Sequence, residues 1–165
     1  MLIARTRAPQ DAGEPTLALV LTFEQRSRSR LHATLADGAS IGLDLPRGTV
    51  LRGGDRLVTD DGRVVAVRAA DEEVIDAHCD DAAMLARVAY HLGNRHAAVE
   101  VGADFVRFLG DPVLATMAAR LGARVVERRA PFEPEAGAYA AGHHAHSGEA
   151  RHAGVIHDMI ERVRK

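Results

Sequence analysis

The sequence predicts an α+β protein with a small all-β N-terminal domain, a second domain of mixed helices and strands, and a flexible histidine-containing C-terminal tail. Apolar residues alternate with a period of two through residues 1–70, whereas strand and helix periods take turns from residue 71 onward. Five of the nine histidines fall within the last 23 residues. These observations predict domains at residues 1–70 and 71–142 and a tail at 143–165.

The first predicted domain consists of short strands separated by turns. Its alternating apolar residues indicate strands near residues 17–23, 31–35, 41–45, 57–59 and 64–67. Turn chemistry lies between them, at Asp37-Gly38, Pro46-Arg47-Gly48, Arg52-Gly53-Gly54-Asp55 and Asp61-Gly62. We expect six strands in all, one more than these ranges locate, and the pattern leaves open whether they close as a barrel or as a sandwich.

The second predicted domain begins with a strand over residues 73–78. Asp80 or Asp81 then caps a helix, and Gly93 suits a left-handed position at its end. Strands at 97–101 and 105–108 follow, Asp111 and Pro112 start a second helix, and residues 124–128 form a last strand. This βαββαβ order is that of the ferredoxin-like motif, which places two helices on one face of an antiparallel sheet.

The segment from Pro131 to His143 is rich in proline, acidic and small residues, as linkers are. We expect a flexible tail from about Ala140. Near its end an amphipathic stripe could form a short docking helix, built from Val155, Ile156, Met159, Ile160 and Val163.

The charge and composition exclude several classes of protein. Twenty-one basic against 23 acidic residues leave a formal charge of −2, which provides no general field for nucleic acid or an anionic membrane. No apolar run reaches the roughly 18 residues of a membrane span. The N-terminus lacks the charged segment followed by an apolar segment that is typical of a signal peptide. We therefore expect a cytoplasmic protein without membrane or nucleic-acid partners. The single cysteine, Cys79, is expected to be buried and inert.

The histidines are the candidates for chemistry, because phosphate-loop, zinc-protease and serine-hydrolase motifs are absent. Imidazole suits nickel, copper and zinc, and closely spaced tail histidines can share one ion. The tail candidates are His143, His144 and His146, with His152 and His157 as weaker ones. His96 follows the end of a predicted helix, and this position alone predicts a structural role for it. A two-fold axis beside it would turn it into a pair of ligands.

Five short motifs give the chain a specific resemblance to the UreE family of urease accessory proteins, from Leu17 to Tyr139. They are LPRG (45–48) with LRGGD (51–55), ADEEV (70–74), LGNRH (92–96) and PFEPEAGAY (131–139). The resemblance implies a nickel metallochaperone for urease assembly rather than an enzyme. It implies a peptide-binding-type N-terminal domain and a homodimer that forms through the second domain.

The same resemblance assigns residues and partners. It implies that His96 is the nickel ligand at the dimer interface and that tail histidines join it. The implied recipient is the urease accessory GTPase UreG and, through it, apo-urease with its accessory complex. Some relatives carry a His-x-His pair where this chain has Gly110-Asp111-Pro112, so we expect no auxiliary surface site there.

Two other interpretations remain open. A protein- or nucleic-acid-binding module with an incidental histidine tail would use the arginines of Arg26–Arg30 or the sheet of the second domain. We expect residues 24–30, however, to be a solvated loop or an edge strand. A zinc hydrolase is least favoured, because no motif places a general base beside a metal. Imidazole chemistry does not separate nickel from zinc or copper at the same site.

Overall fold

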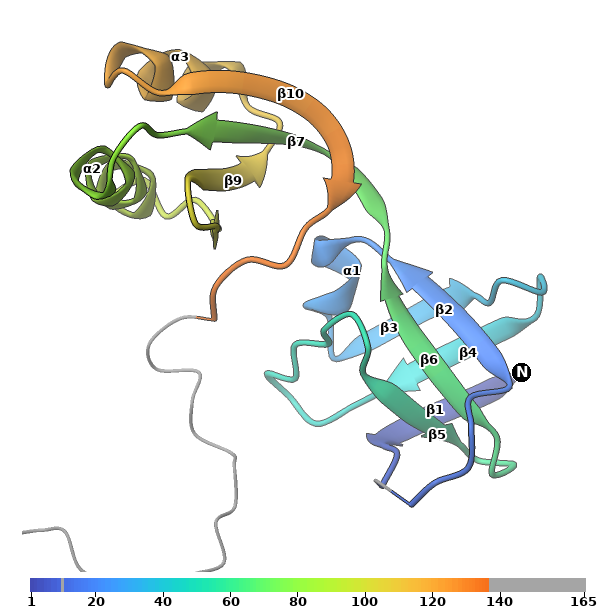
Figure 1. Cartoon of the computed structure of the whole chain (residues 1–165). Coiled ribbons are helices and arrows are strands. Elements are labelled where there is room, and N and C mark those ends of the chain that lie inside the picture. Colours follow the sequence, from blue (N-terminus) through green and yellow to red (C-terminus); the bar gives the residue numbers. More distant parts are fainter. Residues whose placement is uncertain (10, 137–165) are drawn as a thin grey trace, which may run out of the picture. The chain divides into compact units, whose positions relative to one another are not determined.

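The computed structural model describes residues 1–9 and 11–136, and these residues form two sheets (Figure 1). The first sheet has six strands: β1 (Leu2–Arg7), β2 (Leu17–Leu21), β3 (Arg30–Thr34), β4 (Ser40–Asp44), β5 (Arg56–Thr59) and β6 (Val64–Ala69). Their order is β2-β6-β5-β1-β4-β3. All six strands belong to one sheet, which favours the barrel alternative over a sandwich. The sequence pattern did not locate β1.

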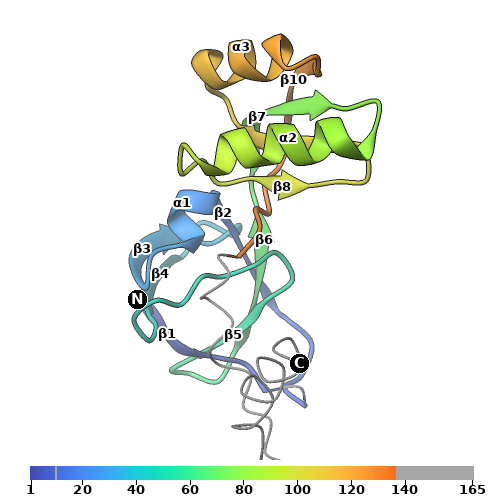
Figure 2. The same cartoon turned by 90° about the vertical axis from the view of Figure 1, so that its left-hand side faces the viewer.

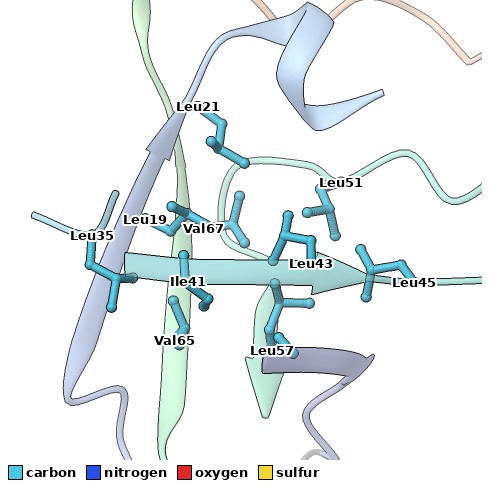
Figure 3. Packing of buried hydrophobic residues seen from close by; sticks show 11 residues of the cluster. Leu19, Leu21, Leu35, Ile41, Leu43, Leu45, Leu51, Leu57, Val65 and Val67 are labelled. Carbon is cyan, nitrogen blue, oxygen red and sulfur yellow. The ribbon is translucent and has the colours of Figure 1, made fainter. Parts of the chain in front are cut away.

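The interior of the first sheet is a cluster of leucine, isoleucine and valine side chains (Figure 3). The alternation along β2 explains it, because Leu19 and Leu21 are buried whereas Val20 between them is 48% exposed. The turn at Asp37-Gly38 lies between β3 and β4 as predicted, and Gly38 has a φ of 87° there. The strand and turn pattern therefore predicted the core of this sheet correctly.

A short helix, α1 (Phe23–Arg26), follows β2, whereas the sequence predicts that Phe23 continues the strand. That prediction is wrong because Thr22 and Gln25 form a capping box. The Gln25 amide donates to Thr22 Oγ1 over 3.3 Å, and the Thr22 amide donates to Gln25 Oε1 over 3.0 Å. These bonds turn the chain out of the sheet directly after Leu21.

The second sheet is antiparallel, with the strand order β10-β7-β9-β8. Its elements follow in the predicted βαββαβ order: β7 (Asp71–His78), α2 (Ala82–Gly93), β8 (Glu100–Val101), β9 (Phe105–Leu109), α3 (Pro112–Arg120) and β10 (Arg124–Pro131). Strand β8 is shorter than predicted and β10 runs three residues further. Both helices pack on one face of this sheet (Figure 2), against Ile75, Ala77, Val106 and Phe108.

The segment after β10 is packed, which corrects the expectation that a linker begins at Pro131. Phe132 is fully buried, and Pro134 is buried as well. The Phe132 ring meets the Phe23 ring edge to face, with centroids 5.5 Å apart, in a small cluster with Val74 and Ala130. A single apolar residue between prolines is a weak sequence signal, so composition alone did not predict this contact.

Candidate metal centre

Helix α2 leads into the turn that carries His96. Asp81 caps its start, accepting a 2.7 Å hydrogen bond from the Met84 amide on Oδ1. The inner face of this helix carries its two buried residues, Val88 and Leu92. At its end the Arg95 amide bonds to the Leu92 carbonyl over 3.0 Å, and the His96 amide bonds to the Gly93 carbonyl over 2.9 Å. The backbone of residues 94–96 is therefore a closed, hydrogen-bonded turn.

His96 has an unusual backbone in this turn. Its φ is 56°, and among residues 1–9 and 11–136 it is the only residue other than glycine with a positive φ. A β-carbon makes this left-handed region unfavourable by about 1 kcal/mol or more. The side chain of His96 is exposed. The fold thus presents an accessible imidazole on a strained turn.

The predicted left-handed position at Gly93 is wrong. Gly93 is the last residue of α2, and Asn94 after it has right-handed angles of −64° and −15°. The Ala97 amide bonds back to the Leu92 carbonyl over 3.2 Å, so the chain reverses only after three further residues. The left-handed conformation consequently falls on His96.

The end of α2, which precedes His96 in the chain, carries aromatic and basic side chains. Tyr90 is 65% exposed, and its ring meets the His91 ring edge to face at 5.4 Å. The Arg95 guanidinium donates to the His91 carbonyl over 3.0 Å. Within residues 1–9 and 11–136 there is no cluster of three or more histidine, cysteine, aspartate or glutamate side chains that could hold a metal ion.

The predicted ligands of the tail lie beyond the part of the chain that the structure describes. These are His143, His144 and His146, together with the weaker candidates His152 and His157. The amphipathic stripe from Val155 to Val163 lies outside the described residues too.

Cys79 is buried, as the sequence predicts, with 7% of its surface exposed. Burial raises the pKa of its thiol, and the nearby carboxylates of Asp80, Asp81 and Asp104 raise it further. Its Sγ donates to the Ala77 carbonyl over 3.5 Å. The thiolate, which is the form that attacks electrophiles and binds metals, is therefore disfavoured.

The expectation of a solvated loop or an edge strand over residues 24–30 is wrong for Arg26 but holds for Arg30, which begins the edge strand β3. Arg26 is fully buried, and its guanidinium donates to the carbonyls of Leu21, Leu51 and Phe132. It also forms a 2.9 Å ion pair with Glu133. Arg28 and Arg30 are exposed but pair with Glu24 and Asp44. The buried Arg26 has no access to a phosphate, which weakens the nucleic-acid alternative.

A second buried charge lies inside the four-stranded sheet. Asp76 is 1% exposed and binds Arg107 through two hydrogen bonds of 2.6 and 3.0 Å, and Arg128 through one of 3.2 Å. Burial alone would raise the pKa of Asp76, but the hydrogen bonds and charges of the two arginines outweigh it and lower the pKa. This carboxylate is therefore ionised and fully used within the sheet, unlike a free general base.

Asp111, beside which we expect no auxiliary surface site, serves the fold. Its Oδ1 accepts hydrogen bonds from the amides of Val113 and Leu114, at 2.8 and 3.0 Å, and Pro112 occupies the first turn of α3. The predicted helix start is confirmed.

Comparison with known proteins decides the family. The model of the UreE urease accessory protein N-terminal domain matches residues 2–70, and that of the C-terminal domain matches residues 72–163. The chain belongs to the UreE urease accessory protein family. The LGNRH motif that carries His96 lies within the matched C-terminal region. The name of the family describes its members as urease accessory proteins.

Three UreE relatives show the extent of the similarity. The urease accessory protein UreE of Cupriavidus pinatubonensis is 57% identical over 129 residues, which are 78% of this chain and 58% of the relative. UreE of Ralstonia nicotianae is 57% identical over 129 residues, 78% of this chain and 61% of the relative. UreE of Burkholderia pseudomallei is 57% identical over 130 residues, 78% and 64%. The matched part thus spans about three-fifths of these relatives.

No helix in residues 1–9 and 11–136 has the length and apolar character that crossing a membrane requires.

Proposed function

We propose that this protein is a cytoplasmic, homodimeric metallochaperone that binds Ni(II) and delivers it for assembly of the urease active site. In this proposal residues 1–70 form a peptide-binding-type domain, residues 71–142 a ferredoxin-like domain for dimerisation and metal binding, and residues 143–165 a histidine-containing tail. The immediate recipient is the GTPase UreG, which passes the ion towards apo-urease and its accessory complex.

The observation that carries the proposal is the conformation of His96. An exposed imidazole on a left-handed backbone is unfavourable for the fold, and such strain clusters at functional sites. Membership in the UreE family supports a metal-binding role for that imidazole. An isologous two-fold contact beside α2 would bring the partner's copy of the same histidine to the same ion.

A site of this kind would release its ion to an acceptor rather than hold it permanently. Two symmetry-related copies of His96 provide two nitrogen ligands, and His143, His144 and His146 supply the others from a tethered segment. A tether raises the local concentration of a ligand without a new permanent bond, so an acceptor with competing ligands can remove the ion. Zn(II) and Cu(II) bind the same donor type, and we therefore propose that supply and partner set the selectivity.

Calorimetric titration of Ni²⁺ into the full chain, with light scattering to give the mass, tests this function. We expect one tight ion per dimer. His96→Ala should weaken that site by at least about 100-fold, because one substitution removes two ligands from a symmetric site. His32→Ala is the matched control, since His32 is an exposed histidine on β3. Unchanged tight binding in His96→Ala, or a loss of binding in both variants, would contradict the proposal.

A further inference from the structure

A row of charged side chains crosses the four-stranded sheet on the face away from its helices. Asp76 on β7, Arg107 on β9 and Glu100 on β8 are direct cross-strand partners. Arg107 is held by its two hydrogen bonds to the buried Asp76, and its Nη1 donates to Glu100 Oε1 over 3.4 Å. Arg128 on β10 binds Asp76 from the other side. The row therefore connects Glu100, on an edge strand, to a charge buried inside the sheet.

Strand β8 is a short edge strand, so contacts outside its backbone ladder matter for its position. It has two residues and pairs with β9 at the edge of the sheet. The second carboxylate oxygen of Glu100, Oε2, accepts a 2.8 Å hydrogen bond from the Glu133 amide. Next to it the Glu135 amide donates to the Val99 carbonyl over 2.7 Å. Glu100 thus fixes β8 from two sides, to β9 and to the segment that follows β10.

A short, partly packed segment connects Glu100 to the His96 turn. Ala97 and Val99 are partly buried and pack against the core between the helices and the sheet. The Ala97 amide bonds back to the Leu92 carbonyl, as described above. Glu100 follows His96 by four residues, so their Cα atoms are at most about 14 Å apart. A displacement of β8 would therefore act on the turn through very few residues.

The backbone conformation of His96 needs support on both sides. A left-handed backbone at a residue with a β-carbon persists only where the surrounding structure over-determines it. Before His96, the end of α2 supplies the hydrogen bonds of the turn. After His96, the support comes from the Ala97 amide and from β8. If β8 left β9, the chain after Ala97 would be free to shift, and His96 would relax towards a negative φ and turn its imidazole away.

We propose that Glu100 is a positioning residue for metal binding: its contacts with Arg107 and with the Glu133 amide hold β8 on the sheet and so keep the His96 imidazole oriented for the ion. The inference rests on the proposed nickel function. Glu100 is not a ligand in this role, because each of its carboxylate oxygens already accepts a hydrogen bond within the fold.

The first test needs no metal. A strong nuclear Overhauser effect between the amide and α protons of one residue marks a positive φ, so this signal reports the backbone of His96 in the full chain. Glu100→Ala removes both contacts of the carboxylate, and we expect the signal of His96 to weaken. Glu127→Ala is the matched control and should leave the signal unchanged, because Glu127 is an exposed glutamate on β10, the opposite edge strand. An unchanged signal in Glu100→Ala, or an equal weakening in both variants, would overturn the inference.

The second test is competitive Ni²⁺ titration of the full chain, with Glu100→Ala made in the native chain and in the His96→Ala chain. We expect about a five- to tenfold loss of affinity in the native chain, at or below the roughly 10–100-fold typical of a residue bonded to the ligand itself. The weaker binding of the His96→Ala chain should not change, because Glu100 acts through His96. Glu100→Gln should recover part of the affinity, since its amide oxygen still accepts one of the two hydrogen bonds.

The dependence on His96 separates positioning from general stability. An equal loss in both chains, or native affinity in Glu100→Ala, would overturn the inference and leave the proposed function in place. A native chain that binds no nickel would overturn both, whatever the signal of His96. If Glu100→Ala does not fold, Glu100→Asp keeps the charge but is one methylene too short to hold both partners. The same loss of signal and the same dependence on His96 are then required of it.

Discussion

Helices α2 and α3 pack against the same sheet and each leads into one of its strands, yet they end differently. After α3, Leu121 keeps right-handed angles and Gly122 takes a φ of 102° before β10 begins. After α2, three residues form a turn and the positive φ falls on His96. Glycine adopts this region without a steric penalty, whereas histidine does not.

The difference indicates whether backbone conformation or side-chain chemistry explains the residue type at each position. At Gly122 the residue type follows the preference of the backbone. At position 96 a glycine would suit the backbone better, so the imidazole is kept against that preference. This is the pattern expected where a side chain is needed for binding rather than for folding.

The largest effect on stability is expected at the end of α3. Gly122→Ala places a β-carbon at a φ of 102° and 3.2 Å from Met84 Cε, although this flexible side chain can yield. We expect a loss of about 1–2 kcal/mol in the free energy of unfolding, mainly from backbone strain. Urea denaturation followed by circular dichroism measures it. An unchanged midpoint would mean that Gly122 is not held in the left-handed region.

The end of α2 should respond in the opposite direction. His96→Gly relieves the backbone strain at φ 56° and should raise the free energy of unfolding by about 0.5–1 kcal/mol while nickel affinity falls. Asn94→Gly is the control, because Asn94 has a φ of −64° and glycine there should only destabilise. If His96→Gly destabilises the protein as Asn94→Gly does, the imidazole holds the turn and our comparison fails.

The smallest effect concerns Gly93, which distinguishes the sequence prediction from the structure. Gly93 is helical and a β-carbon there would meet nothing within 4 Å. Gly93→Ala should therefore stabilise the protein by about 0.5 kcal/mol. A left-handed Gly93, as predicted from the sequence, would make the same change destabilising. The thermal midpoints of the two proteins decide between these outcomes.

Local patterns predicted most of the strands and both long helices. Alternation located β2 to β6, and Asp111 with Pro112 marked the start of α3. These signals act between neighbours, so one sequence contains them. The end of α2 was missed because Gly93 is an acceptable helical residue as well as a cap. The turn extends to His96 because the carbonyl of the buried Leu92 accepts a hydrogen bond from the Ala97 amide.

Contacts between distant residues were beyond such patterns. Arg26 stands among other arginines in a polar segment, and nothing nearby indicates that it is buried. Its acidic partner is 107 residues away, between two prolines that suggest a linker. The family resemblance predicted His96 as a ligand, but nothing in the sequence indicated that Glu133 pairs with the buried Arg26. The partners of Glu133 depend on which segments of the chain the fold brings together.

The burial of Arg26 has a consequence for the newly made chain. Domains at the N-terminus emerge first from the ribosome, and the strands β1 to β6 are synthesised well before residue 133. Until then Arg26 lacks both its ion-pair partner and the Phe132 carbonyl. The buried positive charge of Arg26 is therefore neutralised only after translation has passed Phe132 and Glu133.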